Sequence, residues 1–114
     1  MVTGLEAKVT DKIIVIVTTG KISEAKKIAR AVVEKRLAAC VNIIPKITSV
    51  YRWKDALETD EEFLLVIKTR RARFDDLRKC IESLHSYEVP EVIAMPIVEG
   101  SANYLNWIEQ SVPE

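Results

Sequence analysis

Residues 37–53 read LAACVNIIPKITSVYRW, and this stretch decides the fold. Apolar and polar side chains alternate along it on both sides of Pro45, as they do in a β-strand. Proline has no N–H group to donate to a neighbouring strand, so it belongs on the edge of a sheet or at a bulge. The stretch therefore predicts one long edge strand that is interrupted at Pro45.

Apolar patterning on either side predicts the remaining elements. Residues 62–69 (EFLLVIKT) predict a second strand, antiparallel to the first across a turn at residues 54–60. The β-branched run at residues 13–19 predicts a strand in the centre of the sheet, and residues 91–98 predict a further strand. Helical spacing predicts a helix from Ser23, a candidate N-cap, to residue 36, another at residues 71–87, and a short one after Ser101.

The resulting order is β-α-β-β-α-β-α, which predicts an α+β fold. We expect a ferredoxin-like βαββαβ domain at residues 12–114 with an extra C-terminal helix, preceded by a flexible arm at residues 1–11. Two helices would cover one face of a four-stranded antiparallel sheet. The two hairpin strands are apolar on both sides, so the other face also needs a cover, either from the last helix or from further copies of the chain. We expect an oligomer in which hairpins pair between copies.

The bulk composition limits the classes of function. Lys and Arg total 17, and so do Asp and Glu, so no net positive field attracts nucleic acid or an anionic membrane. The longest apolar run, residues 13–17, is far shorter than a membrane span, and the N-terminal residues lack a signal-peptide pattern. Cys40 and Cys80 form no metal-binding motif, and we expect reduced thiols in a soluble cytoplasmic protein.

His85 is the only histidine of the chain and follows the second predicted long helix. As a metal ligand it would need further donors, because metal sites use three or four, and Tyr87, Glu88 and Glu91 are nearby in the sequence. Alternatively, an imidazole at the end of a helix complements the helix dipole. The residues alone leave both interpretations open.

Three further residues of the hairpin are candidates for a site. Lys68 ends an apolar strand, so it either extends its ammonium group to water or marks an anion site. Tyr51 and Trp53 lie near the hairpin turn and are expected to anchor an interface. The sequence contains no dinucleotide, phosphate-loop, serine-hydrolase or zinc-protease motif, and we expect no enzymatic activity.

Four segments, in this order, resemble the CutA divalent-cation tolerance family: ARAVVEKRLAACVNIIPKITSVYRWK, VIKTR, LHSYEVPEVIAMPI and YLNWI. The resemblance covers residues 13–111. It implies a ferredoxin-like domain in a homotrimer whose hairpin strands pair between neighbours. It also implies a role in tolerance of copper and other divalent cations, with no established enzymatic reaction. The partners that we expect are further copies of the chain, with no nucleic acid and no membrane, and other protein partners stay open.

The resemblance carries over only part of a proposed copper site. Bacterial members are thought to use a cysteine late in the first strand and two adjacent histidines. These positions hold Val17, Leu84 and His85 here, so only His85 is retained. The resemblance therefore implies weak binding of copper or another divalent cation at His85, and no organic cofactor.

The resemblance also implies a polar cluster near the junction between subunits. Its matches here are Lys68, Tyr87 and Glu91, with Trp53 close by. Such a cluster could bind a small anionic ligand, as in the PII signalling proteins that the CutA trimer resembles. It could equally be a salt-bridged brace that fixes the trimer.

Overall fold

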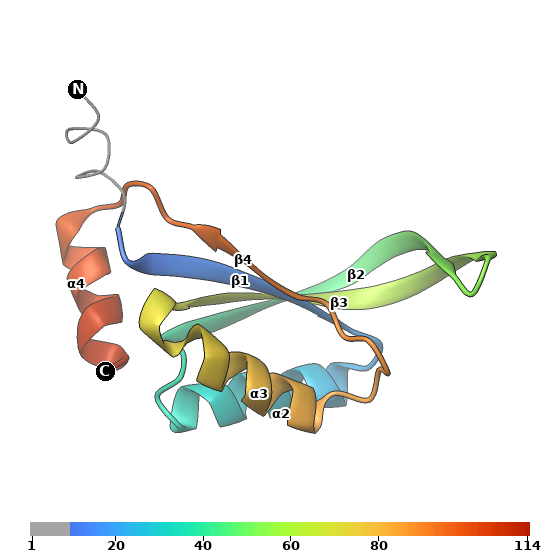
Figure 1. The fold of residues 1–114 in the computed structure, drawn as a ribbon, viewed down its shortest axis with the longest axis horizontal. Coiled ribbons are helices and arrows are strands. Elements are labelled where there is room, and N and C mark those ends of the chain that lie inside the picture. Colours follow the sequence, from blue (N-terminus) through green and yellow to red (C-terminus); the bar gives the residue numbers. More distant parts are fainter. Residues whose placement is uncertain (1–9) are drawn as a thin grey trace.

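The computed structural model describes residues 10–114 (Figure 1). Its elements, in chain order, are β1 (Lys12–Thr19), α2 (Ile22–Glu34), β2 (Cys40–Trp53), β3 (Ala56–Arg70), α3 (Phe74–Leu84), β4 (Val92–Pro96) and α4 (Ala102–Ser111). A 3-10 turn at Arg71–Arg73 precedes α3. The β-α-β-β-α-β-α order predicted from the sequence is confirmed.

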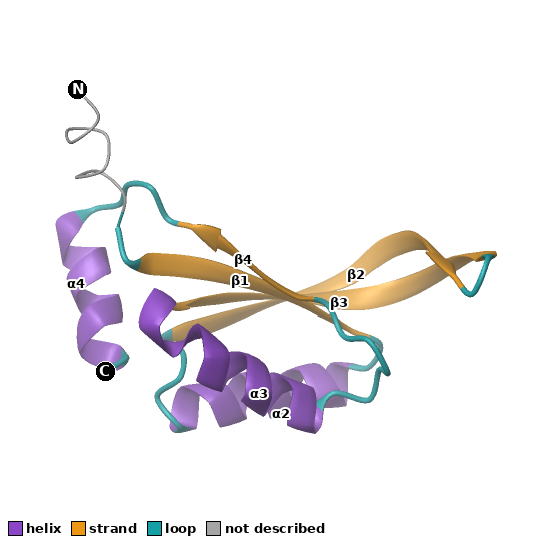
Figure 2. Cartoon of the chain, viewed as in Figure 1, coloured by secondary structure: helices purple, strands orange, loops and turns teal. Residues whose placement is uncertain are grey.

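The four strands form one antiparallel sheet in the order β2-β3-β1-β4. β1 is central and β2 is an edge strand, as the β-branched run and Pro45 predicted. α2 and α3 lie together on one face of this sheet (Figure 2). This is the predicted ferredoxin-like arrangement with an added C-terminal helix.

The core lies between the sheet and α2 and α3. Alternate residues of β1 and β3 point toward the helices, because successive side chains of a strand face opposite sides. Their buried members are Ile13, Val15, Val17, Leu65 and Ile67, and they pack with Ile28 and Val32 of α2 and Leu77 and Ile81 of α3.

None of the helices described between residues 10 and 114 covers the opposite face of the sheet. Ile16 lies between Val66 and Ile93 in register, and these side chains share that face. Ile93 and Met95 of β4 are 54% and 47% exposed. α4 does not cover them: it stands at the end of the sheet where β1 begins (Figure 1). An apolar sheet face of this kind is typical of an interface.

The β2–β3 hairpin is longer than the sequence predicted. β3 begins at Ala56, so the prediction of a turn over residues 54–60 was wrong. The chain reverses at Lys54 and Asp55 alone, both with positive φ (49° and 66°). Two residues of this conformation make a tight turn whose twist matches that of the strands. The expected interruption at Pro45 is confirmed, because the register shifts between Ile44 and Ile47.

Two other elements are shorter than the sequence predicted. α3 ends at Leu84, because His85 adopts an extended backbone (φ −84°, ψ 139°) and starts a loop. β4 covers only Val92–Pro96 of the strand predicted at residues 91–98. Residues 85–91 therefore form a connection between α3 and β4, and this connection contributes much of the site described below.

Most of the predicted N-terminal arm lies outside the described residues. Thr10 and Asp11, which were expected in that arm, are held by the domain: Thr10 Oγ1 donates to the Ile97 carbonyl at 2.5 Å, and Arg70 Nε donates to Asp11 at 3.1 Å. None of the helices found between residues 10 and 114 has both the length and the apolar character needed to cross a membrane. Cys40 and Cys80 are free thiols.

Candidate functional site

Both ring nitrogens of His85 form hydrogen bonds within the fold. The Tyr87 N–H donates to Nδ1 at 3.1 Å, so the ring proton resides on Nε2. Nε2 donates to the carbonyl oxygen of Thr18 at 2.7 Å, and the side chain has no exposed surface. The imidazole thus connects the loop after α3 to the end of β1, and in this arrangement neither nitrogen has a free lone pair for a metal.

Glu24, near the start of α2, lies beside this imidazole. Its Oε1 accepts the Ser86 N–H at 3.1 Å. Its Oε2 is 3.6 Å from His85 Nδ1, is buried, and has no hydrogen-bond partner among residues 10–114. A buried carboxylate oxygen without a partner is costly, so this point of the structure favours a positive charge. No sequence pattern indicated the pair, because Glu24 and His85 are far apart along the chain.

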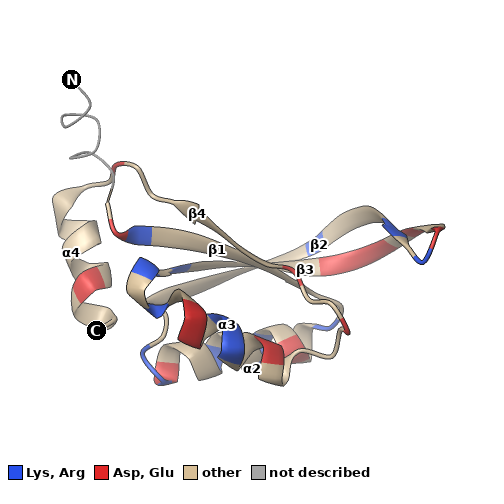
Figure 3. Cartoon of the chain, in the orientation of Figure 1, with Lys and Arg blue, Asp and Glu red and all other residues tan. Residues whose placement is uncertain are grey.

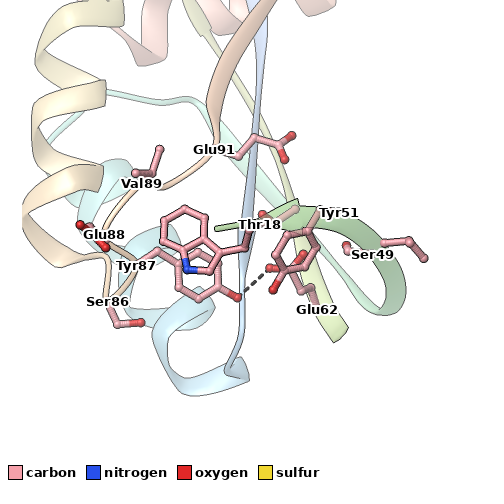
Figure 4. A pocket seen from close by; sticks show the side chains of 11 residues that line it. Thr18, Ser49, Tyr51, Glu62, Ser86, Tyr87, Glu88, Val89 and Glu91 are labelled. Carbon is pink, nitrogen blue, oxygen red and sulfur yellow. Dashed lines mark hydrogen bonds between the residues drawn. The ribbon is translucent and has the colours of Figure 1, made fainter. Parts of the chain in front are cut away.

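Tyr87 reaches from the loop across the end of β1 to β3. Its hydroxyl donates to Glu62 Oε2 at 2.7 Å, and partial burial together with this hydrogen bond raises the pKa of Tyr87. Gly20 allows the approach: a Cβ at that position would lie 3.0 Å from the Tyr87 hydroxyl oxygen. Figure 4 shows the Tyr87 and Glu62 side chains pointing toward one another.

Tyr87 and Glu62 form part of a hollow between the loop after α3 and the part of the β2–β3 hairpin near its turn. We call this hollow the hairpin cavity; its volume is about 700 Å³. It is lined by Thr18, Ser49, Val50, Tyr51, Trp53, Glu62, Ser86, Tyr87, Glu88, Val89 and Glu91 (Figure 4). Four residues predicted for a site, Tyr51, Trp53, Tyr87 and Glu91, are therefore brought together.

The hairpin cavity is acidic. Glu62, Glu88 and Glu91 line it, and none of its lining residues is Lys or Arg. Acidic residues also gather along the outer half of β3 (Figure 3). There Tyr51 donates its hydroxyl proton to Asp60, and this hydrogen bond raises the pKa of Tyr51 to about 12. The charge of the cavity suits a cation rather than an anion.

Lys68 lies apart from this cavity. Its Nζ donates to Asn42 Oδ1 and lies 4.0 Å from Cys40 Sγ, on the open face of the sheet. Within one chain the structure does not bring Lys68 together with Tyr87 and Glu91. The cluster was expected near a junction between subunits, so it stays a prediction. Glu62, which the sequence analysis did not single out, is the residue that contacts Tyr87 instead.

The residues from 10 to 114 include no group of three or more His, Cys, Asp or Glu side chains arranged to hold a metal ion. His85 and Glu24 offer two donors at most. Three or four are usual for a tightly bound transition metal.

The comparison with known families agrees with this fold. The CutA1 divalent ion tolerance protein family matches residues 13–111. This chain belongs to the CutA1 family. The resemblance seen in the sequence is thereby confirmed.

Individual CutA proteins are similar to this chain over most of its length. The Thermus thermophilus divalent-cation tolerance protein CutA is 45% identical over 98 residues, which are 86% of this chain and 95% of that protein. The Homo sapiens Protein CutA is 56% identical over 75% of this chain and 48% of its own length. The crystal structure of Oryza sativa CutA1 has a TM-score of 0.89 at 43% identity, covering 94% of this chain and 98% of that one.

The chain spans about half to three fifths of the frog, mouse and human CutA proteins that it matches: 60%, 49% and 48% of their lengths. These matches are all CutA proteins, and they give no support to the alternative of a PII-like signalling function.

Proposed function

We propose that this chain functions in divalent-cation tolerance as a homotrimer that binds copper or another divalent cation weakly. Membership of the CutA1 family over residues 13–111 supports the role in tolerance. The similar Thermus thermophilus protein carries this function in its name. The cation site and the trimer rest on features of this chain, which are argued in turn.

The observation that carries the cation site is the unpartnered Glu24 Oε2 beside His85 Nδ1. A carboxylate oxygen and an imidazole nitrogen together form a donor set that suits copper and other divalent transition metals. A cation here must compete with the Tyr87 N–H for Nδ1, and it finds only two side-chain donors. Both features make the binding weak.

Titration of the assembled protein with Cu²⁺ by calorimetry tests this site. Glu24→Gln keeps an acceptor for the Ser86 N–H but removes the charge, and we expect it to weaken binding by about tenfold. His85→Ala should weaken it at least as much. Glu99→Gln, at an exposed position away from both residues, is the control. Isotherms of Glu24→Gln and His85→Ala that match the wild type would overturn the assignment.

The trimer is supported by two features of the single chain. The face of the sheet opposite α2 and α3 exposes apolar side chains such as Ile44 and Ile93, and β2 and β4 are open edges. Pairing with identical copies covers both the face and the edges. Sedimentation equilibrium at micromolar concentration should give the mass of three chains, whereas a stable single chain would contradict the proposal.

A further inference from the structure

The loop after α3 makes hydrogen bonds to both residues of the proposed cation site. We call Glu24 and His85 the cation pair. The Ser86 N–H donates to Glu24 Oε1, and the Tyr87 N–H donates to His85 Nδ1, each at 3.1 Å. Two consecutive peptide groups of one loop therefore occupy an acceptor on each member of the cation pair.

The surroundings of His85 orient its ring for a ligand at Nδ1. Nε2 donates to the carbonyl oxygen of Thr18 at 2.7 Å, which places the proton on Nε2 and the lone pair on Nδ1. A metal-bound imidazole commonly donates its second ring N–H to a backbone carbonyl in this way. The lone pair lies beside Glu24 Oε2, which is 3.6 Å from Nδ1 and has no hydrogen-bond partner among residues 10–114.

A cation and the two loop N–H groups compete for the same acceptors. The single lone pair of Nδ1 either accepts a proton donor or binds a metal ion, so a cation there displaces the Tyr87 N–H. The Ser86 N–H forms a charge-assisted hydrogen bond with the Glu24 carboxylate, and a cation drawing on the same charge weakens it. Binding thus costs both hydrogen bonds, and this cost lowers the affinity for the cation.

We propose that the N–H groups of Ser86 and Tyr87 close the cation pair, and that a divalent cation opens it by replacing them. The loop at residues 86–91 is released when the cation binds. This inference rests on the cation binding proposed above and adds its regulation: the peptide group at position 86 limits the affinity, and the loop responds to occupancy. The response extends to β3, because the Tyr87 side chain contacts Glu62 there.

Proline at position 86 tests the role of the Ser86 N–H. Proline has no N–H, so Ser86→Pro leaves Glu24 Oε1 free for the cation. The position is exposed, and His85 before it already has the extended backbone that precedes proline (φ −84°, ψ 139°). Ser86→Ala also removes the hydroxyl group but keeps the N–H, so it is the matched comparison. Calorimetry with Cu²⁺ should give about tenfold higher affinity for Ser86→Pro than for Ser86→Ala, and equal affinities would overturn the proposal.

Hydrogen exchange tests the release of the loop without any substitution. The assembled full-length protein is compared with and without saturating Cu²⁺. Exchange of the Ser86 and Tyr87 amides should accelerate by about tenfold on binding, because both lose their acceptors. The amides of residues 77–81 within α3 are the internal control and should exchange at the same rate in both samples. Unchanged or slower exchange at Ser86 and Tyr87 would overturn the release.

The two experiments separate a failure of this inference from a failure of the proposed function. If the wild type binds no Cu²⁺, or if His85→Ala binds it equally well, the cation pair is refuted as a site. If the wild type binds Cu²⁺ through His85 but the two variants at position 86 bind alike, the site stands and its closure by the loop is refuted. Glu99→Gln should behave as the wild type does in both experiments.

Discussion

His85 Nε2 donates to the carbonyl oxygen of Thr18 at 2.7 Å, across 67 residues of sequence. This hydrogen bond and the one from the Tyr87 N–H to Nδ1 use both ring nitrogens. The only histidine of the chain thus fixes the loop that carries Tyr87 and Glu91 to the central strand. Its role in the fold is directly visible, whereas its role as a metal ligand remains a prediction.

Replacement of His85 by alanine should destabilise the protein. The change leaves the Thr18 carbonyl and the Tyr87 N–H without partners and opens a buried space, so we expect the free energy of unfolding to fall by about 2 kcal/mol. Urea unfolding at one fixed protein concentration measures this. Ser86→Ala, at the exposed neighbouring position, should change it by less than about 0.5 kcal/mol. Equal stability of the two variants would contradict a structural role for the imidazole.

Gly20 should be required for the contact between Tyr87 and Glu62. A methyl group at Gly20 would lie 3.0 Å from the Tyr87 hydroxyl oxygen, so Gly20→Ala should push the phenol away from Glu62. We expect a loss of about 1 kcal/mol and a fall in the pKa of Tyr87 toward its ordinary value, measured by NMR titration. In a Tyr87→Phe background, Gly20→Ala should cost less, because the hydrogen bond is already absent. Equal costs in both backgrounds would refute the coupling.

The turn of the hairpin offers a stabilising substitution. Asp55 has φ 66°, a conformation that glycine adopts without steric cost. Asp55→Gly should therefore raise the free energy of unfolding by about 0.5 kcal/mol. Asp75→Gly makes the same chemical change in the first turn of α3, where it should destabilise by about 1 kcal/mol. If both variants lost stability, the positive φ at Asp55 would not be the controlling feature.

The core elements and the long strand β2 were predictable, and the first residues of β3 were not, for a physical reason. The helices around Ile28 and Leu77 bury one side, so their apolar side chains recur with the helical period. The strand around Val15 is central, and its β-branched run indicated it. Residues 56–61 (ALETDE) are exposed and mostly polar, so nothing in their pattern distinguishes a strand from a loop. The turn at Lys54 and Asp55 lacks glycine, so the sequence did not indicate where within residues 54–60 the chain reverses.

The candidate site was predictable to a similar extent. Tyr87 and Glu91 share one loop and were correctly placed near Trp53. Lys68 was expected with them, but six residues of strand separate it from Glu62, about 20 Å at 3.3 Å per residue. The alternation of Leu64, Val66 and Lys68 extends back to Glu62 and was the available signal for that residue.

The cluster that attaches α4 to the sheet should make stability depend on pH. Lys12 is buried, and its Nζ donates to Asp11 at 2.5 Å and to Glu109 at 2.8 Å. Burial acts to raise the pKa of Asp11, but hydrogen bonds from Lys12 and Arg70 hold it below its ordinary value of 3.8. The hydrogen bond from Lys12 likewise lowers the pKa of Glu109.

A carboxyl group with a lowered pKa in the folded state adds stability above its unfolded pKa and loses it as pH falls through the folded value. Thermal unfolding should therefore show a falling Tm below about pH 4. Lys12→Met should lower the Tm near pH 7 and flatten this acid dependence, because the charge that holds both carboxylates is gone. Glu82→Gln breaks the exposed pair with Arg78 and should leave the pH profile intact. A Lys12→Met protein with the acid profile of the wild type would show that this cluster does not control it.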